Sequence, residues 1–376
     1  MRKDTAKVLK VLRKTFGEGV ALPMSDVAEA SSNSISIGIP SLDWGIFGIG
    51  GYPRSHFTEV YGADKTGKTT LLLHMIAGAQ EEKLVPIVID AKGAVASDNK
   101  RAKRIGVDAE NVILLPIITS EDAVTQARRT VELLAEDGTN LAFFWDDMGL
   151  VPTLSETTGG KKKDKVLAVA TGEKARIMWN FSRVMSATCF RHHIPMVIVN
   201  QLISKIGGFT GGFGKGPQQQ TSGGGGTRYA ARVRLKLSRG EKVKRKVSGI
   251  TKPTAVGQYV YAQSEANHFF PPFRQQKLYL DYHSGYDPVV STLINAEQDG
   301  FVTKAKGTYR DKAWERGTKG KKPGDWTDRE IWVLEERVWP HMDPDFKQST
   351  EEFEDDDEDL EDEEAEEEDF VDLQQV

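Results

Sequence analysis

A loop between two apolar stretches has the residue types needed to hold a phosphate chain. It fits the pattern GxxxxGK[ST], follows the strand-like run FTEVY and opens the helix-like run TTLLLHMIAGAQ. Glycines allow backbone N–H groups to close around phosphate oxygens, and the following helix adds the positive end of its dipole. Lys68 can reach the β- and γ-phosphates of ATP, while the Thr69 hydroxyl can ligate Mg²⁺. The predicted nucleotide-binding residues are Gly62, Ala63, Asp64, Lys65, Thr66, Gly67, Lys68, Thr69 and Thr70.

An acidic residue at the end of a later strand would complete such a site. Residues 141–146 read LAFFWD, which is five apolar residues followed by Asp146. Parallel strands of one sheet present their carboxyl ends at the same edge, so Asp146 is expected near the phosphate-binding loop. We therefore predict that Thr69 and Asp146 together hold Mg²⁺, and that ATP and Mg²⁺ are the cofactors.

Strands and helices alternate along the centre of the chain. Strands are predicted at residues 57–61, 85–90, 141–146 and 195–200, and helices at 68–80, 121–136 and 173–192. This rhythm predicts an α/β fold in which helices cover both faces of a mostly parallel sheet. Glycine-rich residues 155–165 and 205–226 interrupt the rhythm, and neither stretch is expected to form regular elements.

The two ends of the chain differ from its centre. Residues 5–17 predict a short amphipathic helix, which is marginal in isolation and is expected to dock on another surface. Its apolar face consists of Val8, Leu9, Val11, Leu12 and Phe16. The predicted organisation is an N-terminal helix and linker (1–34), an ATPase core (35–280), a small C-terminal α+β module (281–345) and a disordered acidic tail (346–376).

Charge and cysteine content limit the class of protein. The formal net charge of the 376 residues is −5, but residues 351–376 are strongly acidic and the rest of the chain is basic. A basic body with an acidic tail suits a protein that binds a polyanion selectively, although a tail that only improves solubility is an equal alternative. Cys189 is the single cysteine, and no apolar run is long enough for a membrane helix or a signal peptide. We expect a cytoplasmic protein without a membrane partner.

Motifs on both sides of the loop resemble those of RecA recombinases. ISIGIPSLD, GIGGYPR and EVYG precede the loop, and VIDA, IGVD, VIVNQ and KIG follow it in the family's order. The resemblance extends over about residues 5–305, from TFGEG near the N-terminus to GYDP and GFV. It implies a RecA-like ATPase core and an ATP-bound homo-oligomeric filament on single-stranded DNA. It also implies strand exchange with double-stranded DNA, with a loader or a single-strand-binding protein as an accessory partner.

The resemblance also assigns roles to individual residues. Gln201 would sense the γ-phosphate and pass its presence to the loop that follows, and the two glycine-rich stretches would bind DNA. For any single lysine in these loops, a solvated charge is as reasonable as a phosphate contact. The candidate DNA-binding residues are Lys161, Lys162, Lys163, Arg176, Lys205, Phe209, Phe213 and Lys215.

Two positions depart from the family pattern. Lys92 stands where the family has the glutamate that activates water, and Ala266 and His268 stand where it has two lysines that reach across the filament interface. We hypothesise that Lys92 neutralises the γ-phosphate while Glu265 of the adjacent protomer supplies a carboxylate. The catalytic candidates are therefore Lys68, Lys92, Gln201 and Glu265.

Other functions remain open at this point. Lys92 also fits a filament protein that binds ATP without hydrolysing it, because ATP binding alone can favour assembly. A hexameric helicase relative with the same core is a further alternative. So divergent a site suits a bacteriophage-encoded recombinase better than a bacterial housekeeping one.

Overall fold

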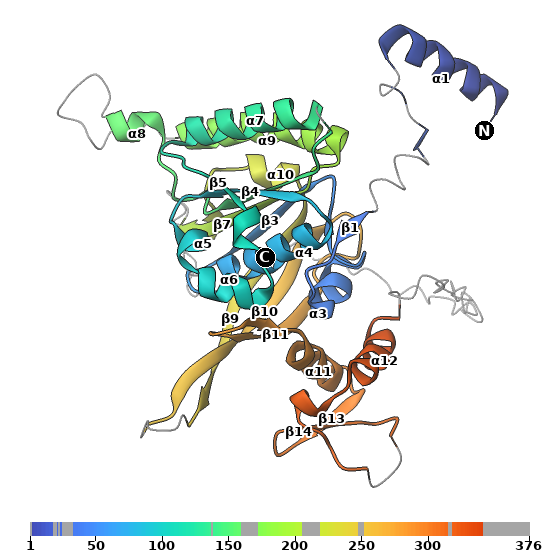
Figure 1. Ribbon diagram of the computed structural model, residues 1–376, viewed down its shortest axis with the longest axis vertical. Coiled ribbons are helices and arrows are strands. Elements are labelled where there is room, and N and C mark those ends of the chain that lie inside the picture. Colours follow the sequence, from blue (N-terminus) through green and yellow to red (C-terminus); the bar gives the residue numbers. More distant parts are fainter. Residues whose placement is uncertain are drawn as a thin grey trace, which may run out of the picture.

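The computed structural model describes residues 2–17, 21, 23–24, 33–136, 138–158, 172–204, 219–246, 252–314 and 318–340. Its centre is a large sheet with strand order β12-β11-β10-β9-β3-β7-β6-β4-β5, and β8 pairs with β7 beside this path (Figure 1). The strands are β3 (Phe57–Gly62), β4 (Val85–Asp90), β5 (Ile113–Leu115), β6 (Leu141–Asp146), β7 (Met196–Ser204), β8 (Gln219–Thr221), β9 (Ala231–Arg245), β10 (Thr254–Asn267), β11 (Gln275–Asp281) and β12 (Gly285–Asp287).

The sheet is parallel from β9 to β5 and antiparallel from β9 to β12. Strand β3 pairs in parallel with β7 and β9, and β4 pairs in parallel with β5 and β6. Parallel neighbours need crossover connections, which here are mostly helical. The connecting helices are α4 (Lys68–Glu81), α5 (Ala94–Ser97), α6 (Asn99–Ile105), α7 (Ser120–Glu136), α8 (Leu154–Thr158), α9 (Glu173–His192) and α10 (Gly226–Ala230). The predicted α/β class with a mostly parallel sheet is confirmed.

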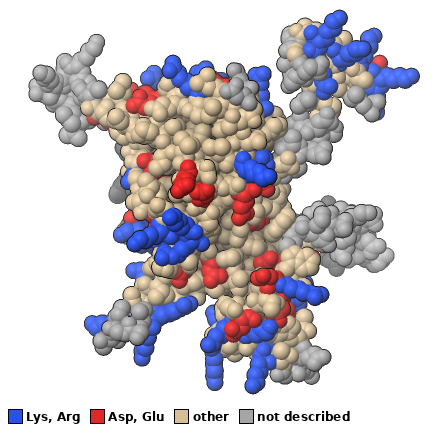
Figure 2. Space-filling model, in the orientation of Figure 1, with Lys and Arg blue, Asp and Glu red and all other residues tan. Residues whose placement is uncertain are grey.

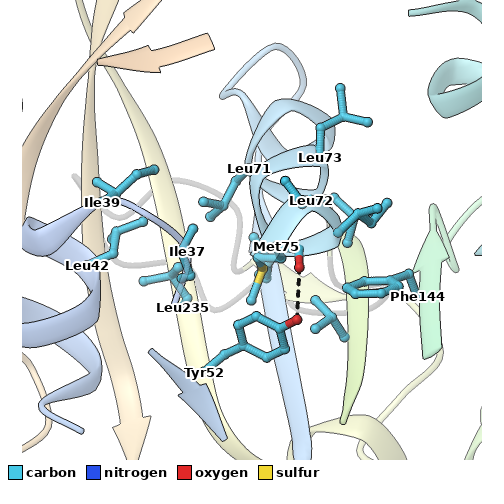
Figure 3. Packing of buried hydrophobic residues seen from close by; sticks show 14 of the residues in the cluster. Ile37, Ile39, Leu42, Tyr52, Leu71, Leu72, Leu73, Met75, Phe144 and Leu235 are labelled. Carbon is cyan, nitrogen blue, oxygen red and sulfur yellow. Dashed lines mark hydrogen bonds between the residues drawn. The ribbon is translucent and has the colours of Figure 1, made fainter. Parts of the chain in front are cut away.

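Alternate residues of the central strands enter two separate cores. On β6, Phe143 and Trp145 pack with α7 and α9, whereas Phe144 packs with α4 on the opposite face (Figures 1 and 3). Figure 3 shows the core that contains Phe144 and α4, in which the Tyr52 hydroxyl donates to the carbonyl of Met75 at 2.8 Å. Because side chains alternate along a strand, a strand buried on both faces is apolar throughout, as the run LAFFW is.

Parts of the glycine-rich stretches are regular, contrary to expectation. The backbone N–H of Thr153 donates to Glu156 at 2.5 Å, and this capping contact begins α8. Residues 219–221 form β8 because they pair with residues 202–204 of β7. Gly226 begins α10, which packs against α9. The prediction that residues 155–165 and 205–226 lack regular elements is therefore wrong for these segments.

Smaller elements flank the sheet. Near the N-terminus lie α1 (Lys3–Phe16), β1 (Ser34–Ile35), α3 (Pro40–Leu42) and β2 (Tyr52–Pro53). After β12 come α11 (Pro288–Gln298), β13 (Val302–Ala305), β14 (Thr308–Asp311) and α12 (Asp328–Val338), which enclose a third hydrophobic cluster around Leu293, Trp326 and Leu334. Within the described ranges, none of the helices has the length and apolarity required to cross a membrane. The acidic tail lies outside the described residues.

Candidate nucleotide-binding site

The phosphate-binding loop lies at the carboxyl end of β3 and leads directly into α4. Gly67 has a φ of +88°, a left-handed conformation that glycine adopts without steric cost. A side chain at this position would also clash with the hydroxyl of Tyr286. The buried Lys68 ammonium donates to the carbonyls of Gly62 at 2.9 Å and Ala63 at 2.8 Å. The loop therefore has the conformation and the cation that its sequence predicts for binding phosphate.

The two predicted magnesium ligands are in contact. Thr69 Oγ1 donates to Asp146 Oδ2 at 2.6 Å, although one residue is in α4 and the other ends β6. Burial raises the pKa of the Asp146 carboxyl to about 6, and the hydrogen bond from Thr69 opposes that shift. Its Oδ1 is buried without a hydrogen-bond partner in the described part of the chain. A hydroxyl beside a carboxylate with an uncommitted oxygen fits Mg²⁺, which is commonly held by one or two protein oxygens plus nucleotide phosphates.

A cavity of about 400 Å³ lies over the loop and includes residues that no motif marks. The Arg101 guanidinium donates to Thr70 Oγ1 at 3.1 Å and to the Tyr282 carbonyl at 2.9 Å. Gln258 donates to the carbonyl of Lys65 at 3.0 Å. These residues come from α6, β10 and the turn after β11, so only the folded chain brings them together. Their contacts at the loop make them further candidates for nucleotide binding.

Comparison with known proteins identifies the family. A family model described as the RecA N-terminal domain matches residues 3–287. The chain belongs to the RecA family. The RecA protein of Thermus aquaticus is 30% identical over 305 residues, which are 81% of this chain and 83% of the relative. The RecA proteins of Aquifex pyrophilus (30% over 301 residues, 80% of each chain) and Campylobacter lari (31% over 284 residues, 76% of each chain) are similar to the same extent.

In this RecA-family protein, Lys92 makes an ion pair at the edge of the nucleotide site. Its Nζ lies 2.9 Å from Asp147 Oδ2, and Lys92 also lines the cavity over the loop. Asp147 directly follows Asp146, and the second aspartate after the apolar run of residues 141–145 is the only sign of it in the sequence. The position after β4 thus carries a cation paired with a carboxylate from the end of β6.

Gln201 lies at the same edge of the sheet as the loop. Strands β3 and β7 are parallel neighbours, and Gln201 is level with Gly62. The carbonyl of Gln201 accepts a hydrogen bond from the backbone N–H of Ser222 at 3.1 Å. Ser222 directly follows β8, so Gln201 touches the far end of the second glycine-rich stretch. This placement is compatible with a role that connects nucleotide and loop.

Glu265 does not line the nucleotide cavity of its own chain. It is on β10 and accepts a hydrogen bond from Arg234 at 3.0 Å, and Arg234 also donates to buried Glu59 at 2.7 Å. The hypothesis for Glu265 concerns the site of an adjacent protomer and stays a prediction.

Most of the candidate DNA-binding residues lie outside the described residues. This applies to Lys161, Lys162, Lys163, Lys205, Phe209, Phe213 and Lys215. Arg176 is described and is exposed on the first turn of α9, the helix that follows the first glycine-rich stretch along the chain.

Proposed function

We propose that this protein is an ATP-dependent DNA recombinase that forms a helical filament on single-stranded DNA and pairs it with homologous double-stranded DNA. Membership of the RecA family supports ATP-dependent recombination and repair as the general class of function. The contact between Thr69 and Asp146 carries the nucleotide part of the proposal. It joins the phosphate-binding loop to the acidic end of β6, as a Mg–ATP site requires.

In this proposal, nucleotide binding uses groups that already surround the loop. Backbone N–H groups of the loop and of the first turn of α4 receive the phosphate oxygens. Lys68 exchanges its two carbonyl acceptors for oxygens of the β- and γ-phosphates. Thr69 and Asp146 hold Mg²⁺, which supplies positive charge to the phosphates. Lys92 adds a second cation beside the γ-phosphate, where negative charge develops during transfer.

Two further residues are proposed to connect the site with the filament. Gln201 senses the γ-phosphate and passes the signal through Ser222 to the second glycine-rich stretch. Glu265 provides a carboxylate to the site of the adjacent protomer, and its side chain is 32% exposed despite its pairing with Arg234. A filament of the Glu265→Gln variant that hydrolysed ATP at the parental rate on DNA would contradict this role.

The exposed face of α1 supports assembly of several copies. Val8 and Val11, one helical turn apart, are 56% and 57% exposed, and an apolar helix face left in water is a candidate for contact with another protein. Figure 2 shows Lys and Arg gathered on α1, over α6 and along the β9–β10 hairpin. Cationic surfaces of this kind attract nucleic acid phosphates. We expect α1 to dock on a neighbouring protomer and the basic surfaces to favour DNA.

Electron microscopy tests the proposal directly. The full chain is mixed with single-stranded DNA, Mg²⁺ and the non-hydrolysable analogue AMP-PNP, and negatively stained images are recorded. Helical filaments are expected, whereas closed rings would indicate the hexameric helicase alternative. Lys68→Ala, which removes the loop cation, should abolish nucleotide-dependent filaments. Strand exchange between a labelled oligonucleotide and homologous duplex then tests recombinase activity.

A second candidate function is a filament that binds ATP without turning it over. The ion pair between Lys92 and Asp147 favours it, because the position after β4 offers no free carboxylate to orient water. ATP binding alone can drive assembly when it favours the assembled state. Phosphate release measured with and without single-stranded DNA separates the two. Release that DNA stimulates indicates an ATPase, whereas no release under either condition, alongside intact filaments, indicates the second candidate.

A further inference from the structure

An ion pair joins two neighbouring strand ends beside the phosphate-binding loop. Strands β4 and β6 run in parallel with Asp90 level with Asp146, so Lys92 and Asp147 leave the sheet at the same edge. The Lys92 ammonium lies 2.9 Å from Asp147 Oδ2 and lines the cavity over the loop. Lys92 therefore faces a carboxylate on one side and the phosphate-binding region on the other.

Asp147 depends on this partner more than Lys92 does. The Asp147 side chain is 0% exposed, whereas that of Lys92 is 28% exposed. The other oxygen, Oδ1, accepts from the backbone N–H of Gly149 at 2.8 Å. Removing the counter-ion of a buried carboxylate is strongly destabilising. Because an ammonium has three donors, Lys92 can keep its bond to Asp147 and still donate to a terminal phosphate.

The turn that begins at Asp147 touches the flanks of both glycine-rich stretches. Lys174, in the first turn of α9, donates to the carbonyls of Gly149 and Val151 at 2.7 Å each. Gly149 also packs against Ser222, since a Cβ added to it would lie 3.3 Å from Ser222 Cβ. Residues 147–151 thus contact the nucleotide site through Lys92. They precede the first glycine-rich stretch along the chain, contact α9 through Lys174, and contact the end of the second stretch through Ser222.

We propose that Asp147 is a positioning residue for the terminal phosphate of ATP. Its carboxylate holds the Lys92 ammonium over the loop, and the turn at 147–151 transmits the state of that contact to the two glycine-rich stretches. With a triphosphate, Lys92 bridges the phosphate and Asp147; with a diphosphate, it contacts Asp147 alone. This inference deepens the proposed function and rests on its ATP site. A residue that only stabilises the fold would leave the preference for ATP over ADP unchanged.

Nucleotide preference measured without DNA provides the first test. Isothermal titration calorimetry in Mg²⁺ gives the Kd of AMP-PNP and of ADP for the full-length parent, Lys92→Met and Asp147→Asn. The parent should bind AMP-PNP more tightly than ADP. Both variants should lose about tenfold of that preference, the effect expected for a hydrogen bond between charged groups. An Asp147→Asn protein that keeps the parental preference overturns the proposal.

Matched variants separate positioning from folding. Lys322→Met removes an exposed lysine from the C-terminal elements, outside the cavity over the loop, and should keep the parental preference; an equal loss there would overturn the proposal. Lys92→Arg keeps a cation that can pair with Asp147 and should retain most of the preference. If Asp147→Asn does not fold, the double variant Lys92→Met/Asp147→Asn, which leaves no buried carboxylate without its counter-ion, decides the matter, because a parental preference in that variant contradicts the proposal.

DNA affinity provides the second test. Fluorescence anisotropy of a labelled oligo(dT) should show tighter binding by the parent with AMP-PNP than with ADP, and similar binding by Asp147→Asn with either nucleotide. A variant that loses nucleotide preference but keeps nucleotide-dependent DNA affinity overturns the proposed transmission. A parent that shows the expected nucleotide preference but forms no filament on DNA would contradict the recombinase function and leave the role of Asp147 standing.

Discussion

The residues around the phosphate-binding loop form a group of alternating charges. Burial lowers the pKa of Lys68; Asp147 opposes that shift and Lys92 adds to it. Burial raises the pKa of Asp146, whose carboxylate accepts a hydrogen bond from the Thr69 hydroxyl next to the loop. Opposite charges in this group stabilise one another and like charges oppose one another, so a single substitution alters both stability and ligand binding. Variants at these positions are therefore informative only beside matched controls.

Asp146→Asn should weaken nucleotide binding only when Mg²⁺ is present. Asparagine keeps the shape of the side chain and can still accept the hydrogen bond from Thr69, but it lacks the charge that Mg²⁺ prefers. We expect the Kd of ATP to rise about tenfold in Mg²⁺ and to change little in EDTA. Isothermal titration calorimetry under both conditions checks this, and equal weakening in EDTA would contradict the assignment of Asp146 as a magnesium ligand.

Lys92→Glu should destabilise the protein although it introduces the carboxylate of the family pattern. The new carboxylate would face buried Asp147, which also loses its counter-ion, at a cost of about 3–5 kcal/mol. The double variant Lys92→Glu/Asp147→Asn should recover most of this loss in urea unfolding. It should also release phosphate faster than the parent in the presence of single-stranded DNA, because a carboxylate could then orient water. Parental turnover in a folded double variant would contradict this.

The helices and strands show what the sequence could and could not predict. The bounds of β4, β6 and α9 agree with the predicted ranges because their apolar patterns are long and uninterrupted. Strand β8 was missed because it exists only through pairing with β7, a contact invisible in a run of glutamines.

The candidate site also contains contacts that the sequence predicts and contacts that it does not. The meeting of Thr69 with Asp146 could be predicted, since a local motif and an apolar run both end at the carboxyl edge of a parallel sheet. Arg101 and Tyr282 could not be predicted, because only tertiary packing brings them to the loop. Asp147 could not be assigned a partner for the same reason.

Gly226→Ala should loosen the contact between α10 and α9. A Cβ at Gly226 would lie 2.6 Å from the Cα of Trp179, which is backbone and cannot move aside cheaply. We expect a loss of about 1–3 kcal/mol in the free energy of unfolding, measured by urea denaturation. Gly324→Ala is the matched control, because nothing lies within 4 Å of its added Cβ. Similar stability of the two variants would show that α10 can shift without cost.

Glu335→Gln should change how stability in the C-terminal elements depends on pH. Burial raises the pKa of Glu335 to about 7, so the folded chain holds a proton that the unfolded chain releases above about pH 4.3. Stability therefore falls as pH rises from about 4 to 7. Glutamine cannot ionise and still accepts the hydrogen bond from Thr292 (3.1 Å for the parent).

Hydrogen exchange of α11 and α12 amides measures this effect. At pH 8, the α11 and α12 amides of Glu335→Gln should have an opening free energy about 1 kcal/mol or more above that of the parent. At pH 4, the two proteins should exchange at about the same rate. Glu336→Gln, one residue further along α12, is the control and should not reproduce the gain at pH 8. A parental pH profile in Glu335→Gln would mean that Glu335 is not the group that titrates.

Across the whole molecule, charge is distributed unevenly. The 17 acidic residues among positions 351–376 leave 55 − 17 = 38 acidic and 50 basic residues in positions 1–350, a formal charge of +12. Figure 2 shows basic groups on α1, α6 and the β9–β10 hairpin. Carboxylates tethered to such a body compete with DNA phosphates for the same cations.

Truncation after Thr350 should tighten DNA binding, and most strongly at low Mg²⁺ and low salt. Added cations screen the carboxylates and weaken their competition, so the affinities of the parent and the truncated chain should converge as Mg²⁺ increases. Fluorescence anisotropy with single-stranded DNA across a Mg²⁺ series measures this. A full-length variant with every Asp and Glu of residues 351–376 replaced by Asn or Gln separates charge from length, and it should match the truncation. If both variants bind like the parent at low Mg²⁺, the tail affects solubility and not DNA binding.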